Sequence, residues 1–164
     1  MKRIIFRKYR WSLLLLCCCA LVQCALKPIP RDLAVYVNRD VDGISGLEDE
    51  GLKCYAGQSG VNFVSDQALR QALVSQVIPA YTRLSVLAGG IKPRTEPVKQ
   101  LHSLYRQAAI LRLQGFRTIL LAIDTQDPDL VGQANRTLDR AQQLTAQWQA
   151  GVDRLAAKYG LKRY

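Results

Sequence analysis

Asparagine and aspartate side chains alternate along residues 38–42, at a spacing that could place several oxygen atoms around one cation. The segment 38–49 is N-R-D-V-D-G-I-S-G-L-E-D, with Asn38, Asp40 and Asp42 at alternate positions and Asp49 at its end. Hard cations such as Ca²⁺ prefer carboxylate and carbonyl oxygens, and a glycine between such ligands lets the chain turn sharply. These four residues are therefore candidate calcium ligands.

These twelve residues resemble the calcium loop of an EF-hand. The four candidate ligands stand at its first, third, fifth and twelfth positions, and Gly43 stands at its sixth. The segment departs from that pattern because Asn38 replaces the usual aspartate, Ser45 replaces a hydrophobic residue, and Asp49 is shorter than the usual glutamate. The resemblance implies a calcium-binding module. The alternative interpretation is an acidic, glycine-rich turn that binds no metal.

Cys54 and His102 are the pair whose chemistry could support nucleophilic catalysis, with the thiol as nucleophile and the imidazole as base. No orienting motif surrounds either residue, and His102 is the single histidine of the chain. A di-iron site inside a helical bundle needs Glu-x-x-His pairs, but Glu96 is the only glutamate after residue 50. We therefore expect a protein that is not an enzyme and that has no resident cofactor.

The N-terminus has the composition of an export signal. Residues 1–10 contain five basic residues and no acid, and residues 13–26 form a nearly uncharged apolar run. A basic segment followed by a short apolar run is typical of a signal peptide. The run is shorter than the roughly 20 residues that a spanning helix needs. We expect residues 1–24 to form a cleaved signal peptide, of either the lipoprotein or the ordinary type, and the mature chain to lie on the periplasmic face of a bacterial membrane.

The four residues Leu21-Val22-Gln23-Cys24 resemble the lipobox of bacterial lipoproteins, in which the chain is cut just before a cysteine that carries lipid. Gln23 departs from the family pattern, which has glycine, alanine or serine at this position. The resemblance implies a lipid anchor at Cys24. Two alternatives are cleavage near Ala20 or Ala25, which would give a soluble periplasmic protein, and an uncleaved N-terminal anchor.

Residues 25–62 predict a spacer followed by an irregular module. Two prolines in residues 27–32 favour an extended spacer, and the composition of residues 33–37 is typical of a strand. Five glycines then interrupt the chain at Gly43, Gly46, Gly51, Gly57 and Gly60. Because Tyr36 and Tyr55 flank this glycine-rich part, they are candidate residues of an interaction surface.

Residues 63–164 predict a bundle of three helices at about 66–87, 96–123 and 128–159. Apolar residues recur in them at spacings of three and four, which indicates amphipathic helices. Ser65, Thr95 and Asp127 are suitable N-caps, and Pro79 predicts either a kink in the first helix or two shorter helices. Long helices joined by short turns pack antiparallel. The expected fold is all-α, an elongated antiparallel three-helix bundle behind the signal peptide and the irregular module.

The charge of the chain is basic. The formal net charge is +10, and removing the five basic residues of the signal leaves +5, because all thirteen acids lie beyond residue 26. Such a charge suits an acidic partner or surface, whereas the export signal argues against nucleic acid. We therefore expect an envelope protein whose bundle binds another envelope protein as an accessory, assembly or neutralising subunit. The alternative is a periplasmic ion- or ligand-binding module that uses residues 38–49.

Overall fold

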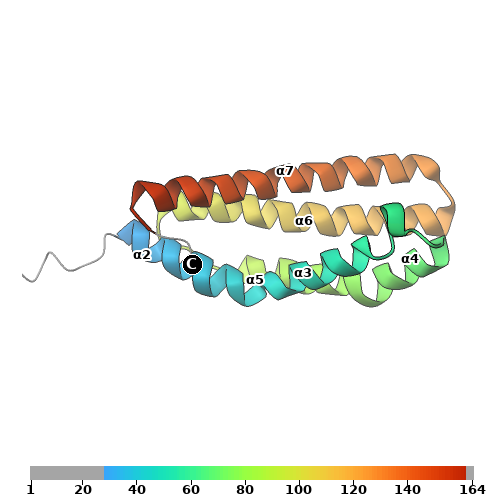
Figure 1. Cartoon of the computed structure of the whole chain (residues 1–164), viewed down its shortest axis with the longest axis horizontal. Helices are drawn as coiled ribbons and strands as arrows, with labels where there is room; N and C mark the ends of the chain where they lie inside the picture. Colours follow the sequence, from blue (N-terminus) through green and yellow to red (C-terminus); the bar gives the residue numbers. More distant parts are fainter. Residues whose placement is uncertain (1–27, 162–164) are drawn as a thin grey trace, which may run out of the picture.

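The computed structural model describes residues 28–161, which form an elongated bundle of four antiparallel helical rods (Figure 1). The rods consist, in order, of α2 (Pro28–Val35), η1 (Tyr36–Val41) and α3 (Asp42–Ala56); α4 (Asp66–Ala72), η3 (Leu73–Val77) and α5 (Ile78–Gly90); α6 (Glu96–Thr125); and α7 (Pro128–Lys158). A short 3₁₀ turn, η2 (Gly60–Asn62), lies between the first two rods. The all-α prediction is thus confirmed for the described part of the chain. The predicted signal peptide and Cys24 lie outside it.

The prediction of an irregular module over residues 25–62 is wrong for the first rod, because residues 28–56 are helical throughout. Its buried residues include Leu33, Tyr36 and Val41. The step of five from Tyr36 to Val41 breaks the ordinary helical period, and the π-helical segment η1 covers this step. A π turn contains more residues than an α turn, so it keeps both side chains on the buried face. The bundle therefore has four rods and not the three predicted.

The second rod passes through Pro79 without ending. Proline lacks an N–H and its ring crowds the carbonyl of the preceding turn. The π-helical segment η3 ends just before Pro79, and such a wider turn gives a helix room for the ring. Ser65 begins this rod as predicted, since its hydroxyl accepts a hydrogen bond from the Ala68 N–H at 3.2 Å.

The third and fourth rods match the predicted helices to within two residues. Asp127 caps α7 as predicted, with its carboxylate accepting from the Asp129 N–H at 2.9 Å. Gln126 adopts a left-handed conformation, with φ of 52°, at the turn between α6 and α7. Gly115 and Gly151 are buried where the two helices meet and leave room for Leu138 and Leu101, respectively.

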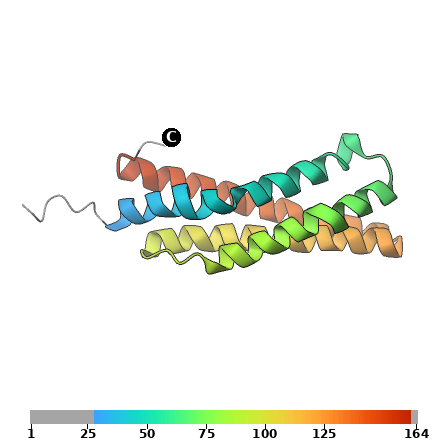
Figure 2. The ribbon, with the colours of Figure 1, turned by 90° about the horizontal axis from the view of Figure 1, so that it is seen from below.

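The bundle has two distinct ends (Figures 1 and 2). The end that we term proximal contains α2, the loop 91–95 and the last residues of α7. The distal end contains the loop 57–65 and the turn 126–127. Buried apolar residues form one cluster toward each end, with Tyr36, Val98 and Val152 in the proximal cluster and Tyr81 and Phe116 in the distal one. None of the helices within residues 28–161 is long and apolar enough to cross a membrane.

Candidate functional site

The four candidate calcium ligands lie on the helical first rod, Asn38 and Asp40 in η1 and Asp42 and Asp49 in α3. A helix spreads such residues around and along its axis, whereas a calcium loop wraps them around one point. The carboxylate of Asp40 accepts instead from Nε of Arg39 at 2.9 Å. Within residues 28–161 no three His, Cys, Asp or Glu side chains are grouped so as to hold a metal ion. Calcium binding by these residues stays an untested prediction.

The two candidate interaction tyrosines have different surroundings. Tyr36 is fully buried, its hydroxyl accepts from Nε1 of Trp148 at 3.1 Å, and its ring meets His102 edge-on at 5.5 Å. Tyr36 therefore belongs to the core and to no surface, because the first rod is a packed helix. Tyr55 is partly exposed near the distal end, and its ring packs against Phe116 at 4.9 Å.

A polar layer crosses the middle of the bundle around Arg112. Its side chain is only 7% exposed, and its guanidinium donates to Glu48 of α3 and, at 3.1 Å, to Oε1 of Gln142 in α7. The hydroxyl of Tyr105 donates to the other carboxylate oxygen of Glu48 at 3.3 Å. Burial lowers the pKa of the Arg112 guanidinium. This layer joins three rods, and sequence reasoning missed it.

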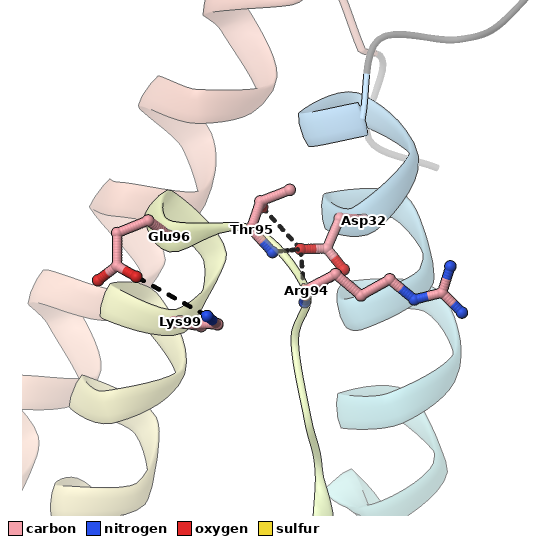
Figure 3. Close-up of polar contacts among 5 residues, drawn as sticks. All are labelled: Asp32, Arg94, Thr95, Glu96 and Lys99. Atoms are coloured by element: carbon pink, nitrogen blue, oxygen red, sulfur yellow. Dashed lines mark hydrogen bonds and ion pairs between the residues drawn. The ribbon is translucent and has the colours of Figure 1, made fainter.

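A buried carboxylate, that of Asp32, closes the proximal end (Figure 3). It accepts from the Thr95 hydroxyl at 2.7 Å and from the backbone N–H groups of Thr95 and Arg94 at 2.8 and 3.1 Å. Thr95 is the N-cap residue of α6, but its own side chain makes no capping bond there. Asp32 thus holds the start of α6 from another rod. Burial acts to raise the pKa of this carboxyl, and the hydrogen bonds from Thr95 and Arg94 outweigh it, so the pKa is lowered.

Replacing Asp32 with asparagine should therefore destabilise the protein in a pH-dependent way. A carboxyl whose pKa is lowered by folding stabilises the fold above its unfolded pKa of about 4, and this contribution is lost as the pH falls through the folded value. We expect the free energy of unfolding of the wild type to exceed that of Asp32→Asn by about 1 kcal/mol at pH 7. This difference should shrink below about pH 4. Urea unfolding at pH 7 and pH 3 measures both values. An equal difference at the two pH values would contradict the assignment.

An open groove lies on the surface beside the first half of α6. Its volume is about 430 Å³, and its charged lining residues are Lys92, Lys99 and Arg106. His102 also lines it, although its side chain is buried and its ring nitrogens have, among residues 28–161, no polar partner except the Ala88 backbone, met at poor hydrogen-bond geometry. Burial, Arg106 and Lys92 lower the pKa of His102, against the opposing effects of the Ala88 backbone and Asp40. The groove is thus a cationic surface above a buried imidazole whose protonation is disfavoured.

The distal loop exposes a group of apolar side chains. Val61 is fully exposed, Val64 is 76% exposed and Phe63 is 49% exposed. The loop is held to the end of α3 because the Asn62 side-chain amide donates to the Ala56 carbonyl at 3.0 Å. Large apolar side chains gathered on a surface often mark an interaction site. No role was predicted for this loop from the sequence.

Comparison with known proteins gives no relative for this chain: no family model, no curated protein and no solved structure matches it. The geometry of these residues is therefore what guides a functional proposal.

Proposed function

We propose that this protein is an exported, membrane-tethered helical bundle that binds another envelope protein through its distal loop. The observation that carries the proposal is the exposure of Val61, Phe63 and Val64 in a single loop. Such exposure costs solubility unless the side chains meet a partner. Tyr55, which packs beside the same end, extends this apolar surface toward α3.

The position of the loop favours a protein partner over a lipid one. α6 contains 30 residues and is therefore about 45 Å long at 1.5 Å per residue. The described part of the chain begins with α2 at the opposite, proximal end (Figure 1). A lipid anchor at Cys24 would place the distal loop tens of ångströms from the membrane. An aromatic residue with aliphatic neighbours, as in residues 61–64, is a common centre of a protein interface.

The bundle supports a role as an accessory, assembly or neutralising subunit and not as an enzyme. Two of the interior groups that could do chemistry are engaged in structure: Arg112 with Glu48, and Tyr36 with Trp148. Cys54 lies on α3, far along the first rod from Tyr36, whose ring contacts His102. Burial, and to a lesser extent the charge of Glu50, raises the pKa of the Cys54 thiol. A raised pKa disfavours the nucleophilic thiolate at neutral pH.

A photo-crosslinking amino acid at position 63 of the full chain, expressed in the cell envelope, should join one discrete protein partner. The same group at position 86 is the matched control, because Val86 is 70% exposed on α5 but lies away from the distal loop. Changing Val61 and Val64 together to aspartate should abolish the product at position 63, since charged side chains cannot enter an apolar interface. Equal labelling from positions 63 and 86, or labelling of lipid alone, would refute the proposal.

The tether is tested on the same preparation by intact mass. The expected species begins at Cys24 and carries added acyl mass. Its acyl chains would hold the protein at the membrane, because each buried CH₂ contributes about 0.8 kcal/mol to membrane binding. Cys24→Ser should leave the chain either soluble or unprocessed. A soluble wild-type chain that begins near residue 21 or 26 would contradict the tether without affecting the crosslinking result.

A further inference from the structure

We propose that the groove beside the first half of α6 binds the phosphate of an anionic phospholipid headgroup. This inference rests on the proposed function, because it takes the proximal end of the bundle to face the membrane. The groove consists of cations supplied by two segments that the fold brings together: Lys92 from the loop 91–95, and Lys99 and Arg106 from α6.

The cations of the groove line one surface and are not neutralised within it. Residues 99, 103, 106 and 110 share one face of α6, at spacings of three and four. No acidic residue lines the groove. Lys99 has only a 3.9 Å exposed pair with Glu96 (Figure 3), Lys92 donates to the Gly89 carbonyl, and Arg106 has no ion pair among residues 28–161. Such a surface attracts a phosphate group.

His102 gives the groove a second feature that points to an anion. The imidazole is 6% exposed, lines the groove and, within the described part of the chain, has no polar partner except the Ala88 backbone, which it meets at poor hydrogen-bond geometry. The positive charges of Arg106 and Lys92 act on it, while Asp40 is the opposing charge on the neighbouring rod. A bound phosphate would compensate those cations. The imidazole would then accept a proton more readily.

The location of the groove favours a lipid headgroup as the source of the phosphate. The proximal end carries more basic than acidic residues among those described: Arg31, Lys92, Arg94, Lys99, Arg154 and Lys158, against Asp32, Glu96 and Asp153. The distal end carries the acids Asp49, Glu50, Asp66, Asp124, Asp127 and Asp129, against Lys53, Arg70, Arg117 and Arg136. A basic end next to the tether suits an anionic membrane surface. Ile91, Pro93 and Ile110 supply apolar contacts for the glycerol and the first acyl carbons.

The single histidine of the chain makes this proposal directly measurable. The pKa of His102 is determined by NMR on the full chain in zwitterionic micelles, before and after addition of short-chain phosphatidylglycerol. We expect the pKa to rise by roughly half a unit or more, because an anion near the imidazole favours its charged form. Short-chain phosphatidylcholine should cause no rise, and inorganic phosphate at the same concentration should cause a smaller one.

Variants separate the groove from general charge. Lys99→Gln with Arg106→Gln should remove the response to phosphatidylglycerol, even though the loss of Arg106 itself raises the starting pKa. Arg117→Gln with Arg140→Gln, two exposed cations outside the groove, should keep the response. A wild type without response, a response that survives in the Lys99/Arg106 variant, or an equal response to inorganic phosphate would each overturn the proposal. Because the micelle measurement needs no lipid on Cys24, its failure is distinguishable from failure of the tether.

Discussion

Replacing Arg112 with alanine is expected to lower the free energy of unfolding by about 3 to 5 kcal/mol. The substitution leaves the carboxylate of Glu48 in the bundle interior without its cation, and an uncompensated buried charge costs that much. It also removes the donor to Gln142 and therefore one link between α6 and α7. Guanidinium chloride unfolding followed by circular dichroism at 222 nm measures the change.

Removing both charges at once is the control for this expectation. Arg112→Met combined with Glu48→Leu should recover most of the loss, because a buried ion pair replaced by apolar side chains of similar size is often neutral or stabilising. Tyr105 then loses its acceptor, so we expect a small residual cost. If Arg112→Ala lowered the free energy of unfolding by less than about 1 kcal/mol, water would have to reach the Arg112–Glu48 ion pair in the wild type. A double variant as unstable as the single one would assign the loss to packing and not to charge.

This polar layer shows why part of the candidate chemistry could not be predicted from the sequence. Arg112 interrupts the buried apolar stripe of α6 between Ala109 and Phe116, and a basic residue in such a stripe is a signal that could have been recognised. Its partner could not, because Glu48 is 64 positions away on a rod that was predicted to be irregular. The link between Asp32 and Thr95 was hidden for the same reason.

The helices that were predicted correctly have strong local signals. α7 has a capping aspartate, a proline in its first turn and a long apolar seam, and each favours the same boundaries. The groove is an intermediate case. The face of α6 that carries Lys99 and Arg106 follows from helical spacing, whereas Lys92 joins it only through the path of the loop 91–95.

The failure to predict the first rod comes from its glycines, which have two different physical roles. Gly43 and Gly46 lie on the exposed side of α3, where an added Cβ would meet nothing within 4 Å. At Gly51 an added Cβ would lie 2.7 and 2.9 Å from two ring carbons of Tyr81. Glycine weakens a helix by roughly 1 kcal/mol relative to alanine. Packing against the second rod overrides that cost, and a single sequence does not show this.

Substitutions at these glycines should consequently have opposite signs within one rod. Gly43→Ala and Gly46→Ala should each raise the free energy of unfolding by about 0.5 to 1 kcal/mol, because the chain loses backbone entropy in the unfolded state and no contact changes. Gly51→Val should lower it by about 2 to 3 kcal/mol. The Tyr81 ring cannot move aside easily, since it is fully buried and packs against Phe116 at 5.0 Å.

Urea unfolding of the three variants tests both the helicity of the first rod and its docking on the second. If all three variants were stabilised, the chain at residue 51 would be helical but would not pack against Tyr81. If all three were destabilised, the backbone at Gly43 and Gly46 would need a conformation that alanine disfavours, as in the turn that the sequence first indicated. Only a helix packed on one side predicts stabilisation at 43 and 46 together with a loss at 51.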